Sequence, residues 1–346
     1  MLERLQQREI IKGGATLKDA LALIAAMHSE GLEFLSKRVL AKKLDFPVDR
    51  LHRNVLVPLG QEAAATSTSS FVFTRHRKIA STIVAMLERD FSEDIGEIFV
   101  GLAVAAVQEI NDDHFLPENP ARWRFDISNH FFNSGRTDLA IKIATAVLSV
   151  EPSNSITRTH LANLYRRAKK PDRAAKLFRS AEGGIHRERS YFFEWAVAEG
   201  EWGNFSENVM LAAYSLNDEI SAPQVDNDNA AFALTGMGVA FGQLYSKYNN
   251  SIFRDARYAV ATIGRSLRLN SEISADLKDH LTQARDQGAP KQTLQQAFNK
   301  LTIGVTEAAK IGVDPEVKVA IIKPTSLGFE GLRSLIENSL KSGKRG

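Results

Sequence analysis

The sequence predicts a mainly α-helical protein, and three observations lead to this fold class. Between residues 120 and 270, apolar residues recur at helical spacing in one segment after another. Runs typical of strands are short, one within 67–74 and a second at 317–322. The 346 residues are 44% hydrophobic and 25% charged, the balance of a globular chain that builds its own cores. That length predicts two or three domains.

The composition excludes several classes of protein. Lys and Arg number 44 against 41 Asp and Glu, so the net charge of +3 excludes a basic field over the whole molecule. Cysteine is absent, which excludes disulfides, thiolate metal sites and a cysteine nucleophile. Residues 1–9 mix both charges and lack the apolar stretch of a signal peptide, and the longest apolar run, 98–107, is too short to span a bilayer. We therefore expect a cytoplasmic protein without a membrane partner.

The first 90 residues carry signals for four helices and a strand. Leu17–Ser29 is amphipathic, Ser36 is placed to cap a helix over Lys37–Leu44, and Pro47 suits the first turn of a third helix that reaches Leu56. The β-branched and aromatic run 67–74 predicts one strand, and a further helix follows at 79–87.

Four regions are expected along the chain. The polar, proline-containing stretch 111–120 marks a boundary. The expected regions are 1–90, a linking helix and loop at 91–119, helical repeats at 120–270, and a C-terminal cap at 271–346 whose basic tail, 341–346, is expected to be disordered.

A 34-residue repeat is visible in the third region. Large apolar residues recur at 127, 161 and 195, small ones at 128, 162 and 196, and turn positions at Gly135, Lys169 and Gly203. Small residues are required where two helices cross closely, and helix pairs stack because one pair leaves its apolar face uncovered. At these residues the chain resembles a tetratricopeptide repeat (TPR) array, most closely at 155–188. A fourth, longer pair is expected at 228–247 and 251–268, in which Gly236 and Gly238 serve close packing.

The first region resembles a different family. Three short helices followed by a strand match a winged helix, and Phe71–Ala80, in which a strand ends at a histidine and a helix follows at once, resembles the winged helix of STAND-type nucleotide-switch ATPases. A winged helix ahead of TPR repeats is also that family's domain order. The resemblance covers about residues 15–270, and it implies that His76, with Arg75 beside it, senses a nucleotide phosphate when an ATPase partner is present.

The ATPase half of that family is missing from the sequence. No G-x-x-x-x-G-K-[ST] motif occurs, and the single Gly-Lys pair, at 343–344, is followed by arginine. This leaves two interpretations: a carboxy-terminal piece of a longer protein, or a shortened relative whose ATPase is separate or lost. The other interpretation of His76 is a helix cap without a ligand.

The residues give little indication of other chemistry. The eight histidines never stand three or four apart, so no helix carries a two-histidine metal face. Asp112, Asp113 and His114 cluster in the boundary loop, where a solvated turn is the simpler interpretation. We expect no catalysis, no metal and no cofactor.

Two segments are locally basic. Residues 31–80 hold nine Lys or Arg against four acids, and residues 155–180 hold eight against Asp172 alone. The first could bind DNA phosphates or a nucleotide, but its third helix offers only Arg50, His52, Arg53 and Asn54 for reading bases. At most weak, non-specific nucleic-acid binding is therefore expected.

The first helix of each repeat pair should line a groove for a protein ligand. Asn129 and Asn163 occupy the same position of the repeat and could pair with a peptide backbone. Arg166 and Arg167, expected to point into solvent, suit an acidic or phosphorylated segment, or an acidic face of the same polypeptide. The expected groove residues are Arg122, Phe125, Asn129, Asn133, Thr159, Asn163, Arg166 and Arg167.

The sequence thus favours a non-catalytic sensor and scaffold that binds a protein or acidic peptide segment and resembles the regulatory half of a STAND ATPase in signalling or defence. Its further expected partner is a P-loop ATPase domain. Two alternatives stay open: a DNA-binding winged-helix regulator with a TPR sensor, and a plain TPR assembly adaptor.

Overall fold

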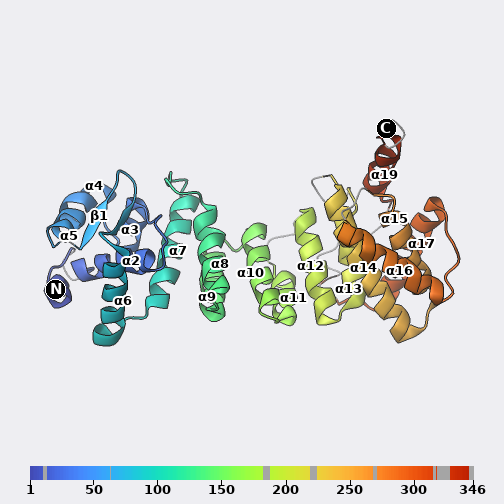
Figure 1. Cartoon of the computed structure of the whole chain (residues 1–346), viewed down its shortest axis with the longest axis horizontal. Helices are drawn as coiled ribbons and strands as arrows, with labels where there is room; N and C mark the ends of the chain where they lie inside the picture. Colours follow the sequence, from blue (N-terminus) through green and yellow to red (C-terminus); the bar gives the residue numbers. More distant parts are fainter. Residues whose placement is uncertain are drawn as a thin grey trace. The chain divides into compact units, whose positions relative to one another are not determined.

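The computed structural model describes residues 1–10, 14–62, 64–181, 188–218, 224–267, 271–314, 317 and 328–342. Most of these residues are helical, which confirms the mainly α-helical prediction (Figure 1). Apart from Val317, which is buried, the strand expected at 317–322 lies outside the described residues, as does the end of the tail, 343–346. The chain divides into two compact units, Met1–Leu161 (the first unit) and Ala162–Gly346 (the second unit), and each is described by itself.

Short helices open the first unit, and polar caps fix where they begin. Thr16 and Asp19 form a capping box at the second helix, and Ser36 caps the third as expected. The elements are α1 (Leu2–Gln6), α2 (Leu17–Ser29), α3 (Lys37–Lys43), α4 (Val48–Leu51), a π-helical turn η1 (His52–Leu56), α5 (Val57–Gln61), β1 (Ala65–Ser67), β2 (Val72–Thr74), α6 (Arg77–Phe91) and α7 (Ile95–Asn111).

The single strand expected over 67–74 is in fact a hairpin. Strands β1 and β2 pair antiparallel, with Ala65 opposite Thr74. The chain turns between them because Thr68 holds Phe71 twice, through its backbone N–H to the Phe71 carbonyl (2.9 Å) and through Oγ1, which accepts from the Phe71 N–H (3.0 Å). Beside β2, Ser36 bridges to Phe71, so the segment before α3 forms a third, very short edge.

One apolar core runs through the whole first unit. Helix α2 is buried along almost its full length, and α7 packs against α2, α3 and α9 (Thr137–Val150). Buried Trp123 and Phe131 belong to the same core as the residues of α2. The compact units divide the chain after Leu161, inside the expected repeat region, whereas the sequence predicts divisions at 90, 119 and 270. The physical reason is that α7 packs against α2 and α3 before it and against α9 after it, so no boundary between cores lies beside this helix.

Helix pairs make up the rest of the chain. In the first unit, α8 and α9 lie side by side (Figure 1). Helix α10 crosses the boundary between the two units. The remaining elements are a π-helical turn η2 (Arg122–Asp126), α8 (Ile127–Asn133), α10 (Ser155–Arg167), α11 (Pro171–Arg179), α12 (Arg189–Trp202), α13 (Phe205–Ser215), α14 (Asn227–Tyr248), α15 (Ser251–Gly264), α16 (Ser271–Asp286), α17 (Leu294–Ile311) and α19 (Glu330–Ser342).

The 34-residue spacing has a conformational counterpart. The three expected turn positions, Gly135, Lys169 and Gly203, have φ values of +84°, +59° and +94°. This left-handed conformation ends a helix and is easiest for glycine. The small residues of the repeat are buried as well, with Ser128 and Ala162 at 0% exposure and Ala196 at 1%.

The second unit packs around α13, which is buried from Ser206 to Ser215. It contacts α12, α14 and α17. Gly238 on α14 makes room for a large neighbour, because a Cβ there would lie 2.7 Å from the His280 ring. Among the described residues, none of the helices is long and apolar enough to cross a membrane.

Candidate functional site

The eight expected groove residues do not fall in one compact unit. Arg122, Phe125, Asn129, Asn133 and Thr159 belong to the first unit, whereas Asn163, Arg166 and Arg167 belong to the second. The role of these residues in one common groove therefore stays a prediction.

The first-unit set is already involved in contacts within that unit. Arg122 pairs with Asp126 (3.7 Å) and lies over the Phe34 ring at 5.5 Å from its centroid. The edge of the Phe125 ring meets His160, whose Nε2 lies 2.7 Å from Ser128 Oγ. Asn129 and Thr159 are half-buried and Asn133 is exposed. These residues form a partly covered surface along α8 and the start of α10.

Arg166 corrects the expectation that both arginines point into solvent. Its side chain is only 20% exposed, and its guanidinium pairs with Glu194 (2.6 Å) and Glu201 (2.9 Å) on α12. It also donates to Asn163 Oδ1 (3.1 Å). The charge of Arg166 is thus balanced by an acidic face of the same polypeptide, one of the partners that the sequence left open. Arg167 is exposed.

The two carboxylates that share Arg166 differ in environment. Burial raises the pKa of Glu194, the positive charge of Arg166 lowers it, and the negative charge of Glu201 raises it again, with a net upward shift. Glu201 is more open, with 43% of its side chain exposed. Two acids share one guanidinium here, so the face between α10 and α12 is not positive.

Other cations of the segment 155–180 also have internal partners. Arg179 is 8% exposed and pairs with Glu199 (2.7 Å) and Asp314 (2.8 Å). Arg158 is buried and donates to the Pro152 carbonyl oxygen (2.8 Å). The excess of charge counted along this segment therefore does not form a continuous basic surface.

His76 caps a helix. It is exposed at the N-terminus of α6, and its Nδ1 accepts the backbone N–H of Lys78 (3.1 Å). Neighbouring Arg75 is also exposed and donates to the Gly60 carbonyl oxygen (3.4 Å). This matches the second interpretation of His76, and phosphate sensing stays a proposal.

The basic segment 31–80 is also partly neutralised. Arg38 and Lys42 pair with Glu109 on α7 at 3.3 Å and 3.5 Å. The candidate base-reading residues Arg50, His52, Arg53 and Asn54 are all exposed along α4 and η1. The sequence therefore located an accessible helical face but overestimated the charge around it.

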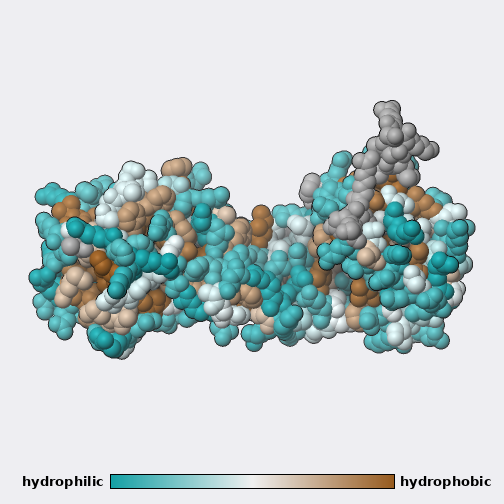
Figure 2. All heavy atoms as spheres, in the orientation of Figure 1, coloured by the Kyte–Doolittle hydropathy of each residue, from teal (hydrophilic) through white to brown (hydrophobic). Residues whose placement is uncertain are grey.

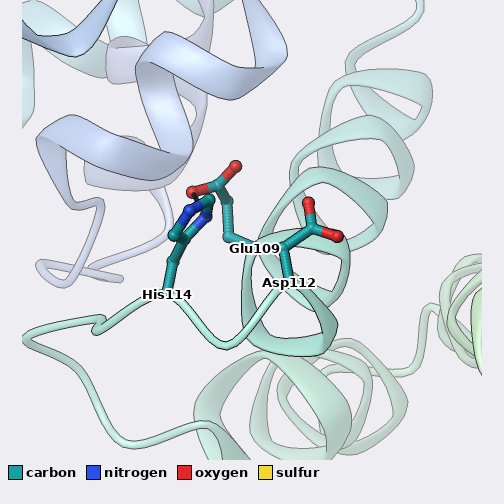
Figure 3. Close-up of side chains that lie close together, drawn as sticks. All are labelled: Glu109, Asp112 and His114. Atoms are coloured by element: carbon teal, nitrogen blue, oxygen red, sulfur yellow. Dashed lines mark ion pairs between the residues drawn. The ribbon is translucent and has the colours of Figure 1, made fainter.

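The acidic residues at the end of α7 form a small cluster with His114. The His114 ring lies against the Glu109 carboxylate, with Nδ1 at 2.9 Å from its oxygen (Figure 3). Ligand atoms of Glu109, Asp112 and His114 lie within 4.8 Å of one another, a group in which Glu109 replaces the expected Asp113. Lys42 pairs with both carboxylates and Arg38 pairs with Glu109, so two cations already balance the two negative charges.

The first unit also contains a cleft of about 610 Å³ beside the start of α7. Its charged residues are largely paired: Arg136 with Glu30, and Lys142 with Glu97. Asp94 caps α7 by accepting the Gly96 N–H (2.8 Å). The charged residues at this cleft thus have structural roles, as ion pairs between segments and as the cap of α7.

A surface of a different kind lies on α12 and α14 in the second unit. Phe193 on α12 meets Phe232 on α14 with ring centroids 6.2 Å apart. Phe232 and Val239 are 49% and 47% exposed. On the side shown in Figure 2, apolar patches interrupt the hydrophilic surface of each unit. We call the residues Phe193, Val197, Phe232, Gly236 and Val239 the α12–α14 face.

Sequence reasoning missed most of this face and the acids next to it. Glu194 and Glu201 stand 28 and 35 residues after Arg166, about one repeat further along. A search of the following repeat for opposite charges would have found them. Phe232 stands 39 residues after Phe193, because the start of α14 at Asn227 lies 38 residues after the start of α12 at Arg189, more than the 34-residue spacing.

Comparison with protein-family models and with curated proteins finds no match for this chain.

Proposed function

We propose that the first 90 residues form a winged helix. Its support is the order of elements: helix α2, the short edge at Leu35–Ser36, helix α3, the helical stretch α4–α5, and the hairpin β1–β2. The backbone N–H of Val72 donates to the Leu35 carbonyl oxygen (2.9 Å), which places the short edge beside β2. The helical stretch before the hairpin keeps an exposed face.

The helix pairs from η2 onward are proposed as TPR-like repeats. Their support is the 34-residue spacing, with buried small residues at Ser128, Ala162 and Ala196. The left-handed turn residues recur at the same spacing. Such pairs stack on their neighbours, and the array forms an extended concave surface that can bind a ligand.

The proposed function is that of a non-catalytic scaffold and sensor that binds a protein segment through the exposed faces of first helices. One observation carries it. Helix α13 is buried from Ser206 to Ser215, whereas α12 keeps a stripe of accessible residues at Phe193, Glu194, Val197 and Glu201. A helix that keeps apolar side chains accessible beside a paired charge network is typical of a peptide-binding surface.

The test is a peptide-display selection with the full chain as bait. Selected peptides should bind the wild-type chain and lose at least about tenfold in affinity toward Phe232→Ser, because exposed aromatic anchors carry much of the energy of such interfaces. Phe115→Ser is the matched control, since Phe115 is a phenylalanine of the first unit that is 84% exposed. Equal binding by the wild type and Phe232→Ser would contradict the proposal.

The finer proposal is that this chain regulates a STAND-type ATPase, with His76 contacting the nucleotide held by that partner. Its support is the domain order and the exposure of His76. The missing P-loop motif implies that the chain alone hydrolyses no ATP. Calorimetry with ATP and magnesium should therefore show no binding with a Kd near 1 µM, which corresponds to a binding free energy of about 8 kcal/mol. A micromolar Kd would contradict a non-catalytic role.

The exposed face of α4 and η1 favours a second candidate function, non-specific nucleic-acid binding. Arg50, Arg53 and Asn54 are exposed there. A labelled duplex should bind weakly at low salt and be released by about 150 mM salt, because few phosphates are neutralised. A footprint on one particular sequence at that salt concentration would instead favour a winged-helix regulator.

A further inference from the structure

The α12–α14 face has an apolar floor on two neighbouring helices. Phe193 and Val197 are one turn apart on α12 and half-buried, while Phe232 and Val239 on α14 are about half exposed. The contact between the Phe193 and Phe232 rings joins the two helices into one surface. Such a surface suits an apolar side chain brought by a partner.

A recess interrupts this floor at Gly236. Gly236 is four residues, about one helical turn, after Phe232, and Val239 is three residues further on. Among the described residues, a Cβ on Gly236 would meet no atom within 4 Å apart from its own helical backbone and chain neighbours, whereas a Cβ on Gly238 would lie 2.7 Å from His280. Gly238 is thus required by packing inside the unit, but Gly236 is not. Because Gly236 has no side chain and stands between Phe232 and Val239 on one face of α14, the surface is lower there than at its two neighbours.

The rim of the face toward α10 is acidic. Glu194 directly follows Phe193, and Glu201 is one turn beyond Val197. Both carboxylates share the guanidinium of Arg166, so one negative charge is in excess within this network. Burial, with the neighbouring negative charge of Glu201, works against the ionised form of Glu194. An added cation would relieve that repulsion.

Resting on the proposed function, we infer that this face binds a segment carrying an apolar side chain next to Lys or Arg. The apolar side chain covers Phe232 and enters the recess at Gly236, and the cation approaches Glu201, the more exposed of the two acids. An acidic segment, which the sequence favoured, would instead bring a third negative charge to Glu194 and Glu201.

Three capped decapeptides test this inference with the full chain: one with alternating Leu and Lys, one with Glu in place of Lys, and one with Ser in place of Leu. Calorimetry should show the Leu–Lys peptide binding at least about tenfold more tightly than the other two, with an affinity that falls as salt rises. Equal or tighter binding of the Leu–Glu peptide would overturn the charge assignment.

Variants locate the binding. Glu201→Gln should weaken the Leu–Lys peptide several-fold, while the control Glu88→Gln, an exposed acid of α6 in the first unit, should not. Gly236→Leu should abolish binding by filling the recess, and Gly236→Ala should retain it, with circular dichroism confirming that both fold. An unchanged affinity for Glu201→Gln or Gly236→Leu would overturn the inference.

Failure of this inference and failure of the proposed function give different results. If the Leu–Glu peptide binds and Phe232→Ser abolishes that binding, the surface is a peptide site and only the ligand charge is wrong. If no peptide binds at about 1 mM and display selects nothing sensitive to Phe232→Ser, the proposed function fails as well.

Discussion

At the scale of single residues, the buried carboxylate of Glu199 shows how the second unit holds a charge in its core. Glu199 is 0% exposed on α12, and it accepts hydrogen bonds from Arg179 (2.7 Å), Trp195 (2.9 Å) and Asn204 (2.7 Å). Arg179 also reaches Asp314, beyond the end of α17. Buried charges persist where donors surround them in this way.

We predict that Glu199→Gln destabilises the chain by about 3–5 kcal/mol, because it leaves the buried Arg179 guanidinium without its closest negative partner. Urea unfolding measures the change. The control is Asp172→Asn, which removes one partner of an exposed pair with Lys176 and should cost less than about 0.5 kcal/mol. Similar stability of the two variants would show that Glu199 contributes no more than a surface charge.

Because of His280, the stability of the second unit should depend on pH, and the direction of the change follows from the shift in the pKa of this histidine. Burial, together with the nearby charge of Arg257, lowers the pKa of His280 to about 4, although Asp276 and Asp279 act in the opposite direction. An unfolded histidine titrates near 6.5, so the unfolded chain binds more protons between these two values. The free energy of unfolding should therefore fall, by about 2 kcal/mol, as the pH drops from about 7 to about 5.

The variant His280→Asn tests this assignment, because an amide can still accept from Arg257 but does not titrate. Arg257 Nη2 lies 3.1 Å from His280 Nδ1. Urea midpoints measured across that pH range should decline less in the variant than in the wild type. Parallel declines would mean that other groups cause the pH dependence.

Residue-level contacts were the least predictable part of the molecule. The sequence indicated Arg166 as a cation of the groove, but its partners Glu194 and Glu201 stand on the next helix pair. Arg179 and Asp314 are 135 residues apart. Such ion pairs depend on how helices far apart in the sequence pack together, and a local sequence pattern does not predict that packing.

At the scale of elements, two of the three glycines in α14 have opposite requirements. Gly236 and Gly238 are two residues apart on a helix, so they point to different sides. Gly238 is buried against the His280 ring, and Gly236 faces open space. The sequence assigned close packing to both, which the structure supports for Gly238 and contradicts for Gly236.

We predict opposite effects for the two alanine substitutions. Gly236→Ala should stabilise the chain by about 0.5–1 kcal/mol, because alanine loses less backbone entropy in a helix. Gly238→Ala should destabilise it by about 1–3 kcal/mol, because its Cβ would overlap His280. Thermal and urea unfolding of the pair check this, and the same sign for both would contradict the packing described for α14.

Elements were predictable where a polar cap or a helical period marked them. The helix Leu17–Ser29 and the cap at Ser36 are confirmed because short side chains at those positions satisfy the first backbone N–H groups. The hairpin was missed because Ser69 and Ser70, which form the turn, were included with the β-branched and aromatic residues of 67–74 in a single strand. A turn held by Thr68 is a side-chain effect that residue propensity does not describe.

At the scale of the whole molecule, the described residues form two separate apolar clusters. One contains residues from Leu2 to Val147, and the other contains residues from Ala162 to Ile336. The repeat spacing continues across the division between them at Leu161, since the buried positions 128, 162 and 196 belong to one series. A sequence period therefore shows which helices pair, but it does not show where a core ends.

Two cores predict two unfolding steps, and the three tryptophans can resolve them. Trp123 is buried in the first unit, and Trp195 and Trp202 belong to the second. Fluorescence of the Trp123→Phe chain should follow the second unit alone, and that of the Trp195→Phe/Trp202→Phe chain should follow the first. Ala174 is fully buried in the second cluster, so adding Ala174→Leu should overpack it by about 1–3 kcal/mol.

That added substitution should lower the urea midpoint reported by the second-unit tryptophans and leave the midpoint reported by Trp123 nearly unchanged. Arg173→Leu is the matched control, because Arg173 is exposed on the same helix α11. A shift of both midpoints by the same amount would mean that the repeat transmits the damage across Leu161 and that the two cores unfold as one cooperative structure. The outcome therefore decides whether the 34-residue period or the division between the clusters governs the stability of this chain.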